Sequence, residues 1–131
     1  MASIFTKIIN GEIPSYKIYE DDKYLAFLDI RPMAKGHTLL IPKVEIDYIF
    51  DLDEDTLSDY LPVAKKIAKA IESIVTCERV GIAVVGLEVP HAHVHLIPIN
   101  SVQDLRFDKA PVKMSNDEMI QLATTIRSAI S

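Results

Sequence analysis

The sequence of 131 residues contains one cysteine, Cys77, and no tryptophan. A single cysteine cannot close an intramolecular disulfide, so the fold does not depend on an oxidising compartment. No apolar run approaches the ~20 residues that span a bilayer, and the stretch from Met1 to Lys7 lacks the apolar core of a signal peptide. We therefore expect a cytoplasmic protein without a membrane partner.

Basic residues are also in deficit, since 14 lysines and arginines stand against 19 acidic residues. Nucleic acids and anionic membranes are bound by basic surfaces, so the net charge of −5 argues against both as the main partner. The chain has no internal repeat, low-complexity tract or linker. Its length suits one domain, and we predict a single domain over residues 1–131.

The spacing of apolar residues predicts three helices and several short strands. The helices are expected at Ile4–Ile9, Asp55–Val75 and from the capping box at Ser115 to Ile130. The strands are expected at Tyr16–Glu20, Tyr24–Ile30, His37–Ile41, Arg79–Val85 and Val89–Pro98. Pro62 should kink or break the long helix. The pattern indicates an α+β fold, with an antiparallel sheet, a long central helix and short flanking helices.

Three of the four histidines alternate with small or apolar residues in one run, His91-Ala92-His93-Val94-His95-Leu96. With a period of two, three imidazoles occupy one face of a strand and three apolar side chains the other. Histidine has an unperturbed pKa of about 6.5, so it exchanges protons near neutral pH. This face is therefore predicted to act on a ligand.

Metal ligation and phosphoryl transfer are the two chemistries that such a row can support. On a strand, the Cβ atoms of His91 and His95 lie roughly 13 Å apart, whereas two nitrogens on one zinc ion lie within roughly 4 Å. The three histidines are therefore poorly placed to share one metal ion. Two of them with His37 could do so, and a histidine metal-site protein remains an alternative.

Catalysis of phosphoryl transfer gives the histidines separate tasks. A neutral imidazole attacks phosphorus when its second nitrogen is hydrogen-bonded, because that bond fixes the tautomer and aims the lone pair. Neighbouring imidazoles can donate to the phosphoryl oxygens as charge develops there. The sequence has no G-x-x-x-x-G-K-[ST] loop, so another device must hold the phosphate.

The histidine run resembles the motif of the histidine triad family of nucleotide hydrolases and transferases. Further segments resemble the same family in order, so that the likeness covers about residues 4–98. They are Ile4–Ile9, Glu12–Pro14, Tyr19–Asp22, Ala26–Ile30 and Gly36–Lys43. The resemblance implies the family's fold and a homodimer, and we expect no cofactor.

The resemblance also implies a mechanism and a role for each histidine. His93 matches the nucleophile, which forms a nucleotidyl-histidine at the α-phosphate of a purine nucleotide conjugate, with its other ring nitrogen bonded to the His91 carbonyl. His95 matches the histidine that contacts phosphate oxygens and the leaving group, His91 supports the site, and His37 matches a fourth histidine beside it. Phosphoramidates, mixed anhydrides and dinucleoside polyphosphates are the candidate substrates.

A nucleoside pocket is expected around Asp29. Leu25, Phe27 and Asp29 share one strand face by the period-two rule, which places a ribose-binding carboxylate beside an aromatic wall. The positions that match the family's pocket are Phe5, Ile8, Phe27, Leu28, Asp29 and Ile30. Several of these apolar residues could instead be plain core, and Asp29 could cap the turn at Arg31-Pro32.

The chain departs from the family pattern at two places. Some relatives carry Cys-x-x-Cys near the N-terminus and bind structural zinc there, but Ser3 and Thr6 stand at those positions, so no structural metal is expected. Leu87-Glu88 replaces polar residues that touch the phosphate or leaving group. Glu88 either lies on the surface, which we favour, or binds an amine leaving group as part of the substrate site. A nucleotide-binding protein with little turnover is therefore a second alternative.

Overall fold

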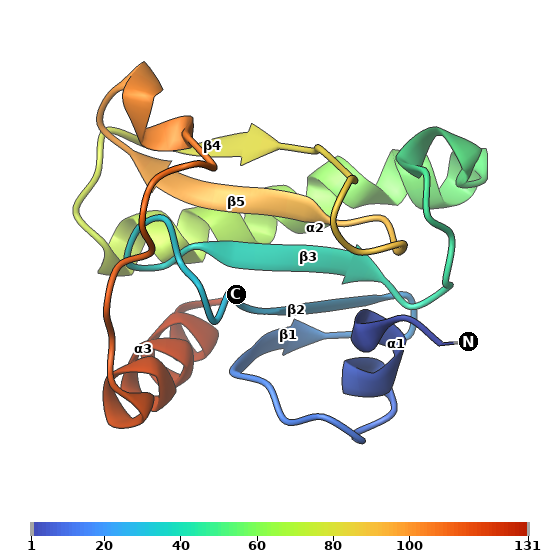
Figure 1. Cartoon of the computed structure of the whole chain (residues 1–131), viewed down its shortest axis with the longest axis horizontal. Coiled ribbons are helices and arrows are strands. Elements are labelled where there is room, and N and C mark those ends of the chain that lie inside the picture. The colour runs from blue at the N-terminus through green and yellow to red at the C-terminus, as the bar shows by residue number, and fades with distance from the viewer. Residues whose placement is uncertain (1, 131) are drawn as a thin grey trace.

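One antiparallel sheet, in the order β1-β2-β3-β5-β4, forms the centre of the computed structural model, which describes residues 2–130 (Figure 1). The strands are β1 (Lys17–Glu20), β2 (Tyr24–Leu28), β3 (Thr38–Pro42), β4 (Arg79–Ala83) and β5 (Val94–Ile99). The helices are α1 (Ile4–Ile9), α2 (Glu54–Ile74) and α3 (Asn116–Ala129), with short 3₁₀ turns η1 (Ile49–Asp51) and η2 (Val102–Leu105). The predicted α+β fold is confirmed.

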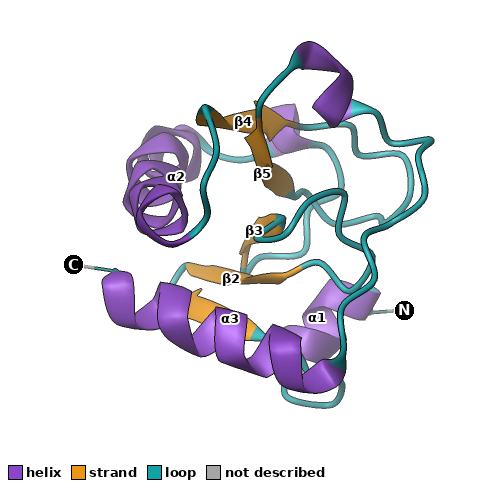
Figure 2. Ribbon diagram, turned by 90° about the vertical axis from the view of Figure 1, so that its left-hand side faces the viewer, coloured by secondary structure: helices purple, strands orange, loops and turns teal. Residues whose placement is uncertain are grey.

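The sheet separates two apolar clusters. The larger cluster lies between the sheet and the helices α2 and α3, and includes Tyr24, Leu40, Ile67, Leu96 and Ile126. The smaller cluster contains Phe5 of α1 together with Leu25, Phe27, Leu39 and Ile41. Figure 2 shows α1 and α2 on opposite sides of the sheet. No helix within residues 2–130 is both long and apolar enough to cross a membrane.

The two longer helices begin at side-chain caps. Asp53 accepts the Thr56 N–H at 2.7 Å and starts α2, and Ser115 and Glu118 form the predicted capping box of α3. The helix α2 runs unbroken through Pro62, contrary to the expected break. Pro62 and Ser58 are both exposed, so solvent can bond the Ser58 carbonyl that the proline leaves without a donor.

The last strand begins later than predicted. β5 starts at Val94 rather than Val89, so His91 and His93 lie in the preceding loop and only His95 lies on the strand. The backbone of this loop does not pair with a neighbouring strand at these residues. The His91 N–H donates to Val89 O at 2.8 Å, and the Ala92 N–H donates to Ile46 O at 2.7 Å. The predicted alternation of faces nevertheless persists, with Ala92 and Val94 in the larger cluster.

Candidate active site

The structure brings all four histidines together. Each is buried, with exposed fractions of 1% for His37, 0% for His91, 5% for His93 and 8% for His95. The ring centroids of His93 and His95 are 5.0 Å apart, and those of His37 and His95 are 5.2 Å apart. The residue before β3, the loop before β5 and β5 itself therefore supply four buried imidazoles.

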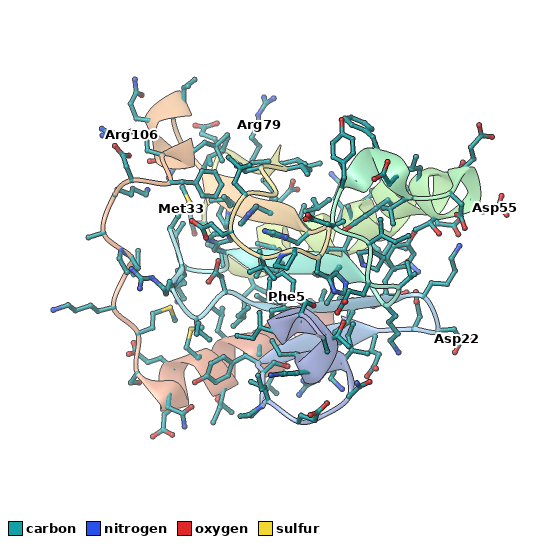
Figure 3. The ribbon with its side chains drawn as sticks, turned by 45° about the vertical axis from the view of Figure 1, so that its right-hand side comes forward. Phe5, Asp22, Met33, Asp55, Arg79 and Arg106 are labelled. Carbon is teal, nitrogen blue, oxygen red and sulfur yellow. The ribbon has the colours of Figure 1, made fainter. Side chains whose placement is uncertain are left out.

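His93 is held in a defined tautomer. Its Nδ1–H donates to the main-chain carbonyl of His91 at 2.7 Å, which leaves the Nε2 lone pair free. The ring of Phe5 meets the His93 ring edge-on, with centroids 5.1 Å apart. Figure 3 labels Phe5, which points from α1 toward the sheet. The arrangement gives His93 the free, oriented lone pair that a nucleophile needs.

His95 presents the opposite tautomer, because a hydrogen-bond chain passes through His37. The Met33 N–H donates to His37 Nδ1 at 3.0 Å, so the proton of a neutral His37 lies on Nε2. That Nε2–H donates to His95 Nδ1 at 2.9 Å, which leaves the His95 proton on its own Nε2. His95 is therefore a hydrogen-bond donor beside the His93 lone pair.

Burial keeps this pair of histidines neutral. Loss of hydration lowers the pKa of His37 to about 3, with a further contribution from the neighbouring His95. The same loss of hydration lowers the pKa of His95 to about 4, with His93 adding to the effect. Both rings are thus uncharged at neutral pH, as the tautomer assignment requires.

The same hydrogen bonds weigh against a metal ion at this cluster. Asp29, His37 and His95 each offer one ligand atom, and these atoms lie within 4.8 Å of one another. The separations suit a cation, with His37 Nε2 at 2.9 Å from His95 Nδ1 and 3.5 Å from Asp29 Oδ2. However, His37 Nδ1 accepts the Met33 N–H, so its Nε2 carries the proton and has no lone pair for a metal. The donor set does not fit a metal.

His91 is fixed from both sides of its ring. Its Nε2–H donates to the Pro42 carbonyl at 2.8 Å, and its Nδ1 lies 2.9 Å from Ser3 Oγ. Thr6 Oγ1 is 3.4 Å from the same nitrogen. The two N-terminal hydroxyls thus belong to a hydrogen-bond network around His91, and hydroxyls are not the thiolate or imidazole ligands that structural zinc takes.

Part of the expected nucleoside pocket is assembled beside the histidines. Phe5 and Phe27 pack edge-on at 5.6 Å, and Ile8 packs against the same apolar cluster. Asp29 Oδ1 accepts the Arg31 N–H at 2.9 Å, which is the alternative turn-capping role, while Oδ2 faces His37 at 3.5 Å. Burial raises the pKa of the Asp29 carboxyl, and nearby Glu88 adds to that shift.

Two residues predicted for the pocket lie elsewhere. Leu28 is 1% exposed and belongs to the cluster beneath α2 and α3, because its position on β2 turns it away from the face of Phe27. Ile30 follows the end of β2, is 75% exposed, and borders another cavity with Tyr16 and Met119. The structure does not bring either side chain to the histidines.

A polar cavity of about 350 Å³ opens beside His37 and His95. Its lining includes both carboxylates and cations, namely Asp29, Glu88, Arg31 and Lys109. The Glu88 side chain is exposed, as the favoured surface position predicts. It also lines this cavity. The ring of Phe107 meets that of His95 edge-on at 4.8 Å.

Sequence reasoning missed five residues of this cavity: Arg31, Met33, Phe107, Lys109 and Pro111. Residues 106–115 form an irregular segment between η2 and α3, so no hydrophobic period marks which side chains turn inward. The one available signal was Phe107, the single aromatic residue of this segment. That signal alone does not distinguish a site residue from a surface one.

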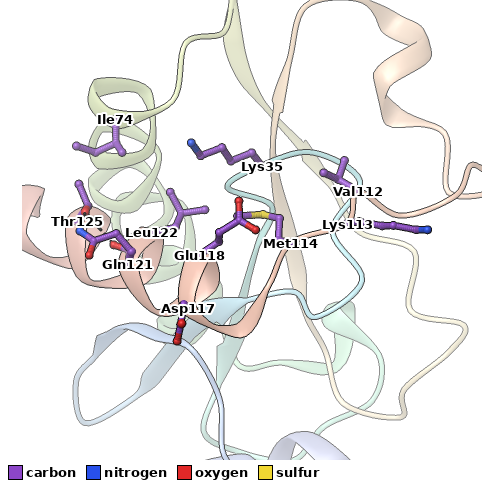
Figure 4. A pocket seen from close by; sticks show the side chains of 10 residues that line it. All are labelled: Lys35, Ile74, Val112, Lys113, Met114, Asp117, Glu118, Gln121, Leu122 and Thr125. Atoms are coloured by element: carbon purple, nitrogen blue, oxygen red, sulfur yellow. Dashed lines mark hydrogen bonds between the residues drawn. The ribbon is translucent and has the colours of Figure 1, made fainter.

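Two other cavities differ in character. One of about 370 Å³ lies beside His93 and has an apolar lining that includes Tyr48, Phe50, Val84 and Leu87. Another, of about 700 Å³, is lined by residues of α3 with Ile74 and Lys35, and contains none of the four histidines (Figure 4). Of the three cavities, only the first two are lined by any of the four histidines.

Comparison with known proteins gives concordant results. A HIT domain matches residues 10–102. An uncharacterized HIT-like protein of Borreliella burgdorferi is 46% identical over 102 residues, which cover 72% of this chain and 73% of that protein. An adenosine 5′-monophosphoramidase of Saccharomyces cerevisiae is 43% identical over 99 residues, covering 74% of this chain and 62% of that enzyme.

The fold is matched by solved structures over nearly the whole chain. A HIT-like protein from Bartonella henselae, described as involved in cell-cycle regulation, superposes with a TM-score of 0.83 at 33% identity, covering 98% of this chain and 96% of that one. The family model spans most of the sequence and includes His37 and the run from His91 to His95. The chain belongs to the HIT, or histidine triad, family.

Proposed function

We propose that the protein hydrolyses purine nucleotide conjugates at the α-phosphate through a covalent nucleotidyl-histidine on His93. The observation that carries the proposal is the pair of opposite tautomers, a free Nε2 lone pair on His93 beside an Nε2–H donor on His95. The adenosine 5′-monophosphoramidases among the relatives support a hydrolase acting on nucleotides.

The reaction proceeds in two displacements. The His93 Nε2 lone pair forms a bond to the α-phosphorus, while the bond to the leaving group breaks and the departing atom takes a proton from water. The His95 Nε2–H donates to a phosphoryl oxygen as charge grows there. A water molecule then attacks the phosphorus, the P–N bond returns its electron pair to His93, and the water's proton passes to solvent.

The direct test is release of AMP from an adenosine 5′-phosphoramidate in the presence of a chelator. The proposal expects catalytic turnover without added metal. Nucleotide binding with no AMP release would favour the binding-protein alternative instead. Activity that disappears with the chelator and returns with zinc would favour the metal-site alternative over the histidine nucleophile.

The leaving group is proposed to occupy the polar cavity beside His95. Its mixed charges, with Glu88 near Arg31 and Lys109, suit a group that carries both an amine and an anion. Phosphoramidates and aminoacyl-type mixed anhydrides therefore match it better than the purely anionic leaving group of a dinucleoside polyphosphate. A screen of AMP conjugates with wild type and Glu88→Gln distinguishes these classes.

Asp29 is proposed to bind the ribose hydroxyls through the carboxylate oxygen that faces His37. Asp29→Asn should weaken AMP binding by about tenfold to a hundredfold, as expected for hydrogen bonds to a charged acceptor. Isothermal titration with AMP measures the effect. The control ligand is 2′,3′-dideoxy-AMP, whose affinity should hardly change. An equal loss of affinity for both nucleotides would show that Asp29 does not bind the ribose hydroxyls.

A homodimer is proposed through the sheet edge at β4. This strand pairs on one side only, and apolar side chains on it and after it are exposed, namely Ile82, Val84, Val85 and Leu87. Light scattering should give about twice the chain mass of 14.7 kDa. The Ile82→Glu variant should have the mass of one chain, because a buried charge would disrupt this interface. A monomeric wild type would contradict the proposal.

A further inference from the structure

The N-terminal helix α1 depends on a carboxylate far away in the sequence. Helices as short as its six residues are not stable alone in water. Glu45 Oε1 accepts the Ser3 N–H at 2.6 Å and the Thr6 hydroxyl at 2.6 Å, while Ser3 Oγ accepts the Thr6 N–H at 3.0 Å. The loop after β3 therefore holds the first turn of α1 in place.

The same network is connected to the histidine cluster by one hydrogen bond, from the Ser3 hydroxyl to His91. The Thr6 hydroxyl donates its proton to Glu45, and the His91 Nε2–H donates to the Pro42 carbonyl. The Ser3 hydroxyl is therefore the donor to His91 Nδ1, at 2.9 Å. The proton positions in the whole network are mutually consistent, and each buried side-chain polar atom in residues 2–130 has a partner.

His91 in turn orients His93, because its carbonyl accepts the His93 Nδ1–H at 2.7 Å. The helix that the network anchors also carries Phe5, whose ring contacts the His91 and His93 rings at 5.8 and 5.1 Å. Fixing α1 thus fixes two supports of His93 at once, one carbonyl and one aromatic ring.

We propose that Ser3, Thr6 and Glu45, here called the N-terminal latch, position His93 for attack. They are positioning residues, since they act through His91 and Phe5 and touch no reacting atom. The inference rests on the proposed function only for the role of His93 as nucleophile. The latch itself consists of hydrogen bonds, and these can be tested without substrate.

Kinetics test the consequence for catalysis. Ser3→Ala and Glu45→Ala should each lower kcat by about tenfold to a hundredfold, the loss expected when a nucleophile is displaced by a fraction of its contact distance. KM for the nucleotide should change little. Ser3→Thr keeps the hydroxyl and Glu45→Gln keeps an acceptor oxygen, so both should restore most of kcat. Glu12→Ala removes an exposed acid just after α1 and serves as the control with wild-type kcat.

Nitrogen NMR of the histidine rings tests the latch without any substrate. Wild-type protein should show His91 protonated at Nε2 and His93 protonated at Nδ1, each as one tautomer. In Ser3→Ala and Glu45→Ala these signals should shift or average between tautomers. If these changes occur in the variants while the wild-type protein releases no AMP, the latch is supported and the proposed function is refuted. Unchanged ring spectra in both alanine variants, or an unchanged kcat, would overturn the latch.

Discussion

Replacing His93 with alanine should abolish AMP release, with a loss of at least about a thousandfold in kcat, because no other side chain can take over as the attacking atom. Among the four clustered histidines, His93 alone combines a free Nε2 lone pair with a neighbouring donor. Single-turnover assays with an adenosine 5′-phosphoramidate measure the loss. The variant should still bind AMP, since Asp29 and Phe27 remain.

The comparison variant is His95→Gln, which removes the imidazole donor but leaves the nucleophile. Its loss should be smaller, about a hundredfold, the size expected for one donor to a developing charge. AMP affinity, measured for both variants, separates a catalytic effect from a collapsed pocket. Substantial residual turnover in His93→Ala, with intact AMP binding, would contradict the assignment of the nucleophile.

Acid should destabilise the protein steeply below about pH 6.5. Burial holds the pKa of His95 at about 4 and that of His37 at about 3, against 6.5 in the unfolded chain. Between these values the unfolded state binds more protons, so the stability present above pH 6.5 is lost as the pH falls. Each histidine contributes a slope of about 1.4 kcal/mol per pH unit in that window. Urea unfolding at a series of pH values measures it.

Asp29 opposes this trend, because its raised pKa makes the folded state bind a proton before the unfolded state does. Lys109 lines the same cavity as His37 and further lowers the pKa of that histidine. A matched variant, His37→Gln, removes one buried titrating group, and its stability should decline less steeply with acid even if it starts lower. Equal stability of the wild type at pH 7 and pH 5 would show that these histidines are not held neutral.

Local patterns in the sequence were sufficient for most of the fold. The apolar period of residues 55–75 placed α2 within one residue of its observed bounds, and Ser115 with Glu118 marked the start of α3. The start of β5 was not predictable in the same way. His91 and Ala92 have strand-like alternation, but their N–H groups bond to Val89 and to Ile46, and the second of these partners is distant in the sequence.

The four histidines and the bond from His93 to the His91 carbonyl were predicted, but the proton position on His95 was not. The motif identified the histidines, whereas the tautomer of His95 depends on the Met33 N–H acting through His37. No sequence pattern records which nitrogen a distant backbone amide meets. Similarly, the absence of cysteine at position 3 gave no hint that Ser3 would bond to His91, because that contact joins residues 88 apart.

The most direct measurement is to quench the reaction early and find the covalent adduct. Substrate labelled at the α-phosphate is mixed with enzyme, stopped in alkali, which preserves phosphoramidate bonds to histidine, and digested for mass spectrometry. If His93 is the nucleophile, label should appear on the His93 peptide before product and decay as AMP forms. Label on a different side chain, or AMP production with no labelled protein at any time, would contradict this assignment.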